Sequence, residues 1–310
     1  MPGDPASGPG PDPGPQGRVS SWLLLVVPPL CWAGNFVIGR AMHADIPPMA
    51  FTFWRWMVAA LVLAPVCAVN TWKQRALIRR HWSLIAALGI TGVVAFQFFV
   101  YQGLQTTTAI NGVLLMSTIP VVIPVFAYLL DGTHLARRQA LGIAVSLAGV
   151  VVVVLRGDPA RAASLHFTPG DLWVALAVPA WALYSVLVRR KPPALAPMTL
   201  LFATVLIGLA VLGPGWAWEL HRRGGFPATG ASLGAILYVG VFASVVAFAC
   251  WNAGVASVGA AKAGVFIHLM PVFAAILAVV FLDERLYGYH LAGVAAIAAG
   301  LWLSSTTTDR

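Results

Sequence analysis

Glycines and prolines in this chain return at matched spacing, and this repetition constrains the fold more than any other feature. The matched intervals are Gly103–Pro120 and Gly254–Pro271 (17 positions each), Pro120–Gly142 and Pro271–Gly293 (22 each), and Gly142–Gly149 and Gly293–Gly300 (seven each). Chance could supply one such match, but it does not supply an ordered series of them. The spacing therefore predicts that the chain is built from two copies of one unit.

The repeat extends upstream to two Trp-Ala pairs. Trp32-Ala33 precedes Pro48-Met49 by 16 positions, and Trp181-Ala182 precedes Pro197-Met198 by the same 16. Each copy covers roughly half of the chain. The two predicted domains span residues 21–156 and residues 171–304.

Composition places the chain in a membrane. Of its 310 residues, 59% are hydrophobic and only 9% are charged, whereas a soluble domain carries about 25% charged residues. The net charge of +9 does not indicate nucleic-acid binding, because the Lys and Arg residues lie in short loops between apolar runs. Residues 1–20 are rich in Pro and Gly, which predicts a disordered N-terminal tail. The three cysteines lie inside apolar runs without metal-ligand spacing, so no metal or other cofactor is expected.

A helix needs about 20 apolar residues to cross a bilayer. Ten segments qualify approximately: Trp22–Gly39, Met49–Val69, Trp82–Gly103, Thr108–Leu130, Gln139–Leu155, Asp171–Val188, Pro197–Leu212, Ser232–Ala253, Ala260–Leu282 and Tyr289–Ser304. We therefore predict an all-α integral membrane protein with ten transmembrane helices. The short links between segments leave no room for a soluble catalytic domain.

Basic residues predict the orientation of the chain. With the N-terminus in the cytoplasm, eleven Lys and Arg residues lie in cytoplasmic segments and six in outer segments, which favours two cytoplasmic termini in a cell inner membrane. Five is an odd number, so the second five-helix repeat enters the membrane from the opposite side. Inverted repeats of this kind are typical of secondary transporters, whose site lies near the midplane between the repeats.

Several features of the sequence resemble a known family of membrane proteins. The two five-helix halves, the Trp-Ala segments and the Pro-containing fourth and ninth helices look like the drug/metabolite transporter superfamily, and within it the EamA-type exporters. The turn Leu282-Asp283-Glu284-Arg285-Leu286 resembles the acidic turn of that family, whereas Leu130-Asp131-Gly132-Thr133-His134 lacks its Glu. The resemblance, which extends to bacterial exporters of amino acids, including aromatic ones, implies export of small amphipathic metabolites by alternating access. It implies no enzyme activity.

Polar and aromatic groups at membrane depth are the candidate substrate contacts, because such groups need a partner or a wet cavity. Asn35 has its counterpart in Tyr184, and Gln97 and Tyr101 share one helix face. Interhelical hydrogen bonds or packing are the alternative for each of them, and Lys262 could equally snorkel to the interface. The predicted substrate-binding residues are Trp32, Asn35, Gln97, Tyr101, Asn111, Tyr184, Trp251, Asn252 and Lys262.

Five further residues have two interpretations each. Arg55 lies between Trp54 and Trp56, which favours an interfacial aromatic belt with a snorkelling Arg. His268 could relay protons or form a hydrogen-bonded core contact. The three helix prolines could kink and gate the fourth and ninth helices or serve shape alone; they are Pro120, Pro124 and Pro271.

No carboxylate lies near the middle of a predicted helix, which leaves facilitated diffusion or coupling through Lys262, His268 or the substrate itself. The expected partners are a small-molecule substrate and the bilayer, with a monomer or weak homo-oligomer and no nucleic acid. Two alternatives stay open: a sugar-phosphate or nucleotide-sugar carrier, which requires several basic groups in the cavity, and a non-transporting scaffold or sensor.

Overall fold

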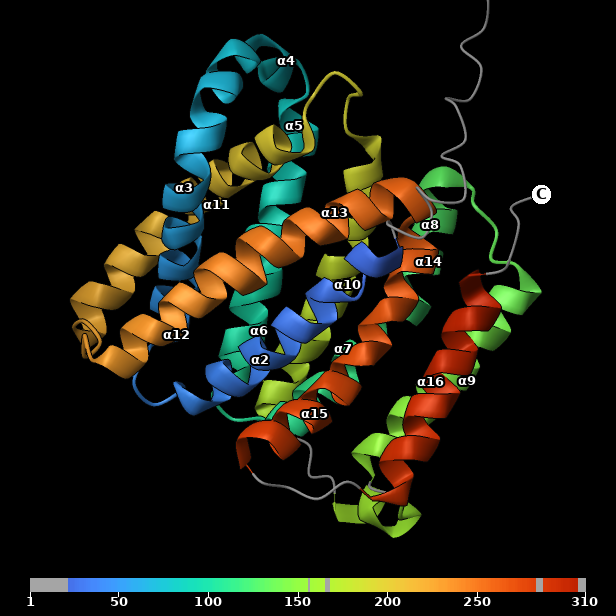
Figure 1. Cartoon of the computed structure of the whole chain (residues 1–310). Coiled ribbons are helices and arrows are strands. Elements are labelled where there is room, and N and C mark those ends of the chain that lie inside the picture. The colour runs from blue at the N-terminus through green and yellow to red at the C-terminus, as the bar shows by residue number, and fades with distance from the viewer. Residues whose placement is uncertain (1–21, 156, 165–167, 283–286, 306–310) are drawn as a thin grey trace, which may run out of the picture.

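The computed structural model describes residues 22–155, 157–164, 168–282 and 287–305 (Figure 1). The predicted disordered tail, residues 1–20, lies outside the described residues, and so does most of the acidic turn at 283–286. Within the described part, the secondary structure is helical throughout.

The helices follow one another with short connections. In chain order they are α2 (Val27–Ala41), α3 (Pro48–Lys73), α4 (Arg75–Arg80), α5 (Trp82–Leu88), η1 (Gly89–Ala95), α6 (Phe96–Leu104), α7 (Ala109–Met116), α8 (Ile119–Asp131), α9 (Arg137–Val154), η2 (Pro159–Ser164), α10 (Pro169–Leu187), η3 (Val188–Arg190), α11 (Pro197–Arg223), α12 (Gly230–Gly240), η4 (Val241–Val246), α13 (Ala247–Val258), α14 (Ala260–Gly264), η5 (Val265–Leu269), α15 (Met270–Leu282) and α16 (Gly288–Ser305).

Seven helical segments of the described chain are long and apolar enough to cross a membrane. Two further apolar segments, Ala260–Ala274 and Leu291–Ser304, are shorter. The all-helical membrane fold predicted from composition is therefore confirmed, whereas the count of ten spanning helices stays a prediction. The seven segments are Trp22–Ala41, Pro48–Lys73, Trp82–Leu104, Asn111–Asp131, Pro169–Arg190, Pro197–Arg223 and Gly230–Val258.

Helices α9 and α16 lie side by side at one edge of the bundle (Figure 1). A Cβ on Gly149 would approach the Gly293 carbonyl oxygen to 2.7 Å, and one on Gly300 would approach the Gly142 oxygen to 2.5 Å. The spacing makes Gly142 equivalent to Gly293 and Gly149 equivalent to Gly300, so each contact joins opposite ends of the repeated glycine pair. Because the later glycine of α9 meets the earlier glycine of α16, the two helices run antiparallel, and only glycine permits this backbone approach.

Two π-helices interrupt corresponding segments of the two halves. η1 lies between α5 and α6, and η4 lies between α12 and α13. Each presents a backbone carbonyl to an indole N–H: Trp56 Nε1 donates to the Val93 oxygen at 2.9 Å, and Trp32 Nε1 donates to the Ala243 oxygen at 3.1 Å. Short π-segments inside α-helices are frequent at functional sites.

The segments that contain the candidate gating prolines are also interrupted. α7 ends at Met116 and α8 begins at Ile119, so Pro120 lies in the first turn of α8, where its missing N–H costs nothing. In the second half the 3₁₀-helix η5 separates α14 from α15, and Pro271 lies in the first turn of α15. Pro124 lies inside α8. A role of these prolines in gating stays a prediction.

Candidate functional site

Arg55 lies in the first half of α3 and is fully buried, with 0% of its surface exposed. Its Nε donates to Ser244 Oγ at 2.9 Å, and its Nη2 donates to the Ala243 oxygen at 3.2 Å. The prediction that Arg55 snorkels to the interface is therefore wrong. The side chain turns inward because the η4 backbone and the Ser244 hydroxyl of the other half supply acceptors there.

Three predicted site residues surround the same guanidinium. Nη1 of Arg55 contacts Asn35 Oδ1 at 3.1 Å, Gln97 Oε1 at 2.7 Å and the Tyr101 hydroxyl at 2.7 Å. Tyr101 in turn donates to Asn35 Oδ1 at 2.7 Å, and its ring stacks on Phe51 at 4.4 Å. The polar groups of α2, α3 and α6 thus form one buried network.

The charge of Arg55 has no acidic partner in this network. Every hydrogen bond of the guanidinium in the described structure is to a neutral oxygen, and its other neighbours are the rings of Trp56 and Tyr101. A guanidinium has five N–H donors, and Nη2 has one acceptor among the described residues for its two N–H groups. A buried cation held only by neutral groups keeps a large part of its desolvation cost.

Aromatic side chains form a second cluster beside the network. Trp32 contacts Trp181 edge-on with ring centroids 4.9 Å apart, and lies 5.5 Å from Trp251. Tyr184 stacks on Trp181 at 5.1 Å, and Phe248 packs against Trp32, Trp181 and Tyr184. The cluster joins α2 of the first half to α10 and α13 of the second half.

Two indole groups of this cluster lack a hydrogen-bond partner among the described residues. Trp181 and Trp251 are 1% and 0% exposed, and neither Nε1 atom has an acceptor. By contrast, the Tyr184 hydroxyl donates to Asn252 Oδ1 at 2.8 Å. Unsatisfied buried donors are rare in folded proteins, and each requires an explanation.

A small cavity is lined by members of both the network and the aromatic cluster. Its volume is about 10 Å³, close to the ~10–15 Å³ that one water needs. In this conformation the cavity has no room for a solute, so a solute can bind there only if the helices around it separate. The lining residues are Trp32, Asn35, Phe36, Phe96, Gln97, Met116, Ile119, Trp181, Ile267 and Met270.

The polar groups on this cavity wall are donors. Arg55 occupies the side-chain oxygens of Asn35 and Gln97, so their amide N–H groups remain for other partners. Trp181 also lines the cavity, and its indole N–H is a further buried donor without an acceptor among the described residues. A wall of N–H donors with a cation behind it is complementary to a ligand that carries oxygen acceptors and negative charge.

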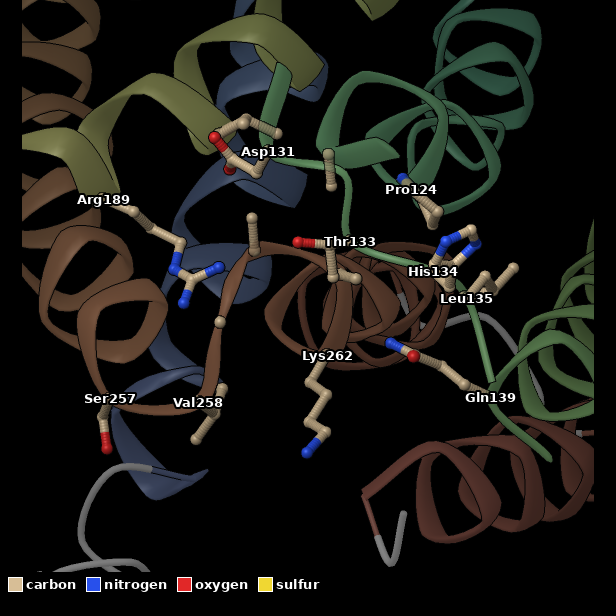
Figure 2. A pocket seen from close by; sticks show the side chains of 15 residues that line it. Pro124, Asp131, Thr133, His134, Leu135, Gln139, Arg189, Ser257, Val258 and Lys262 are labelled. Atoms are coloured by element: carbon tan, nitrogen blue, oxygen red, sulfur yellow. The ribbon is translucent and has the colours of Figure 1, made fainter. Parts of the chain in front are cut away.

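Lys262 and Asn111 do not line this cavity. Lys262 lies on the wall of a second pocket at the end of the bundle that carries Asp131 and Arg189 (Figure 2). Asn111 lies in the first turn of α7, where its backbone N–H donates to the Thr108 hydroxyl at 3.1 Å. Substrate binding by these two residues stays a prediction, as it does for Trp251 and Asn252.

His268 is fully buried at the break between α14 and α15. Its Nε2 donates to the Ser117 carbonyl oxygen at 2.8 Å, and its Nδ1 accepts from the Ser146 hydroxyl. Both ring nitrogens are therefore engaged by neutral groups. The contacts match the core interpretation of this histidine, and proton relay stays a prediction.

Three residues of the site were not among the predicted contacts: Arg55, Trp181 and Ser244. Trp181 could have been added from the repeat, since it is the counterpart of Trp32. Arg55 could have been suspected because a cation that lies seven residues inside an apolar run is too deep for easy escape to water. Nothing in the sequence around Ser244 distinguishes it from the other small polar residues.

Comparison with known proteins agrees with the fold and the duplication. The model of the EamA-like transporter family matches the chain twice, at residues 19–155 and 168–306. The uncharacterized transporter YyaM of Bacillus subtilis (strain 168) is 28% identical, over 84% of this chain and 85% of that protein. A probable terminal-alkyne amino-acid exporter of Streptantibioticus cattleyicolor is 27% identical, over 92% and 93%.

A solved crystal structure shares the fold, with a TM-score of 0.72, 22% identity, and coverage of 92% of this chain and 97% of that one. At this identity the likeness speaks to the fold alone. The two family matches cover most of the chain, one in each half, and the apolar helices agree with a multi-pass membrane protein. The chain therefore belongs to the EamA-like transporter family, whose members are membrane transporters.

Proposed function

We propose that this protein exports amphipathic solutes that carry a carboxylate, with large or aromatic amino acids as the preferred class. Transport is by alternating access between two inverted halves across a cell inner membrane, with both termini in the cytoplasm. The observation that carries the proposal is Arg55, a buried cation without an acidic partner among the described residues.

A substrate carboxylate supplies the anion that this site lacks. Asn35, Gln97 and Trp181 offer N–H groups to the cavity, and Arg55 supplies positive charge behind the two amides. Hydrogen bonds to a charged group each contribute about 1.5–3 kcal/mol. The substrate therefore binds as an anion or zwitterion, oriented with its carboxylate toward α3.

The aromatic cluster supports an apolar or aromatic body for the substrate. Trp32, Phe96 and Trp181 line the same cavity as the two amides. Aromatic side chains bury about 150–250 Å² each and favour stacked or edge-on partners. An amino acid with a large apolar side chain can place its carboxylate against the amides and its side chain against the aromatic rings.

The contacts between the two halves support alternating access. Trp32 and Arg55 of the first half both bond to the Ala243 carbonyl of η4 in the second half. The antiparallel packing of α9 on α16 supports an inverted relation between the halves. When the hydrogen bonds to η4 break, the cavity opens. A bound substrate then supplies hydrogen bonds that replace some of the broken ones.

The amino-acid class is also supported by a relative, since one of the similar proteins is named a probable terminal-alkyne amino-acid exporter. That name describes the Streptantibioticus protein, and the class is carried to this chain as part of the proposal.

Counterflow in liposomes tests the proposal. Vesicles that hold only the purified protein are preloaded with single amino acids, and exchange is followed for a panel that runs from glycine to tryptophan. We expect exchange of large apolar amino acids, and at least a tenfold loss in Asn35→Leu, because the variant removes an amide from the cavity wall.

The matched control is Asn70→Leu, which changes an exposed asparagine of α3 and should leave exchange unchanged. Absence of exchange for every amino acid in a monodisperse, reconstituted protein would contradict the proposed substrate class. Equal losses in Asn35→Leu and Asn70→Leu would contradict the proposed site.

A further inference from the structure

The second pocket lies at the end of the bundle that carries Asp131, Arg189 and Lys262 (Figure 2). Its volume is about 150 Å³, far more than the ~10–15 Å³ that admits one water. Its walls come from both halves: α8, the following loop and α9 of the first half, and α10, η3, α13 and α14 of the second. None of its lining residues lines the small central cavity.

The charge of this pocket is positive. Arg189 and Lys262 line it, together with His134. The carboxylate of Asp131 also lines it, but Arg190 engages this carboxylate, with its Nε 3.0 Å from Asp131 Oδ1. Since the acidic group already has a cationic partner, the Arg189 guanidinium keeps its positive charge on the wall, to which Lys262 contributes an ammonium group.

A buried donor without a partner also faces this pocket. Gln139, in the first turn of α9, is 6% exposed, and its Nε2 has no acceptor among the described residues. Figure 2 shows its amide pointing into the pocket from the side opposite Arg189. An unsatisfied buried amide N–H costs about 1–3 kcal/mol.

We propose that this pocket binds a phosphate oxyanion, held by Arg189, Lys262 and the Gln139 amide. Oxyanions accept hydrogen bonds from several directions at once, which matches donors placed on opposite walls. The Thr133 hydroxyl, also on the wall, adds a further donor. The site is separate from the proposed transport site, so it does not depend on the identity of the exported solute.

The same chemistry could come from free phosphate or from the headgroup of an anionic lipid, because the pocket lies at an end of the membrane-spanning bundle. Binding of inorganic phosphate is measured by calorimetry on the full-length protein in phosphatidylcholine nanodiscs. Retention of phosphatidylglycerol is measured by native mass spectrometry on protein from mixed micelles. The two arms separate the two sources.

Three variants test the pocket in both arms. Gln139→Leu removes the unpartnered donor and should weaken binding about fivefold. Gln139→Glu places a negative charge at the same position and should weaken it more than Gln139→Leu. The double variant Arg189→Gln with Lys262→Gln should weaken it at least tenfold. Arg79→Gln, which changes an exposed arginine of α4 that does not line the pocket, is the matched control.

Phosphate binding that is weakened in the three pocket variants as expected, and is unchanged in Arg79→Gln, supports a site for a free anion. Lipid retention that follows the same order without phosphate binding supports a headgroup site. Absence of both, or losses as large in Arg79→Gln as in the double variant, overturns the proposal. Gel filtration and thermal unfolding verify each variant, and the two Gln139 variants still test the site if the double variant does not fold.

Discussion

His268 lies 151 positions after Ser117, and its Nε2 donates to the Ser117 carbonyl oxygen at 2.8 Å. This offset equals the spacing of the duplicated glycines in this part of the chain, so the bond joins equivalent positions of the two halves. In a continuous helix the Ser117 carbonyl would accept from the Val121 N–H. That group instead donates to the Thr118 oxygen at 3.0 Å, and His268 takes its place at the break.

His268→Leu is therefore expected to destabilise the protein. The variant leaves the Ser117 carbonyl and the Ser146 hydroxyl without their partner in an apolar interior, which should cost about 1–3 kcal/mol. Thermal unfolding in detergent measures the change. Ser146→Ala, which removes one of the two partners, should cost less, and an unchanged unfolding temperature in His268→Leu would contradict this structural role.

Gly149→Ala is expected to separate α9 from α16. The added methyl group would lie 2.7 Å from the Gly293 carbonyl oxygen, so the backbones must move apart, which should cost roughly 1–3 kcal/mol. Gly234→Ala is the matched control, because nothing lies within 4 Å of its new Cβ. Alanine also favours the helix there. Equal unfolding temperatures for the two variants would show that the glycine contact does not stabilise the fold.

Trp181→Phe and Trp251→Phe form a pair that tests the unpartnered indoles. Both tryptophans are buried without an acceptor among the described residues, but Trp181 lines the central cavity and Trp251 does not. Loss of one donor to a carboxylate should weaken amino-acid binding about fivefold or more in Trp181→Phe, with little change in Trp251→Phe. The dissociation constant for the amino acid is measured by isothermal titration calorimetry, whose signal does not depend on tryptophan fluorescence. A larger loss in Trp251→Phe would place the ligand elsewhere.

Much of the fold could be predicted because its determinants are periodic. Matched glycines and prolines predicted the duplication, and the structure packs the repeated glycine pairs against each other in antiparallel order, with Gly142 against Gly300 and Gly149 against Gly293. Composition alone predicted an all-helical membrane protein. The breaks at Ser117 and η5 were suggested by Pro120 and Pro271, but the π-helices η1 and η4 were not predicted, since π-segments leave no distinctive residue pattern.

The site was predicted in part. Asn35, Gln97 and Tyr101 were selected as polar groups at membrane depth, and the structure brings them together. Arg55 was misassigned because its flanking tryptophans favour an interfacial position, and its repeat counterpart, Thr204, gives no contrary signal, since the Thr204 hydroxyl bonds to Leu201 in its own helix. Symmetry is a poor guide here, since the acceptors for Arg55 belong to the other half. Lys262 was grouped with these residues by sequence position, whereas three-dimensional packing places it in another pocket.

Recognition of a carboxylate through Arg55 is the central claim, and a comparison of two ligands tests it most directly. Binding of phenylalanine and of phenethylamine, which lacks only the carboxylate, is measured by calorimetry on the wild type and on Arg55→Met. Arg55→Met keeps an apolar side chain of similar length in place of the buried cation, and gel filtration and thermal unfolding verify that the variant is folded before binding is measured.

The account predicts that wild type binds phenylalanine at least tenfold more tightly than phenethylamine, and that Arg55→Met loses this preference. Equal binding of the two ligands to wild type, or a preference that Arg55→Met retains, would contradict it.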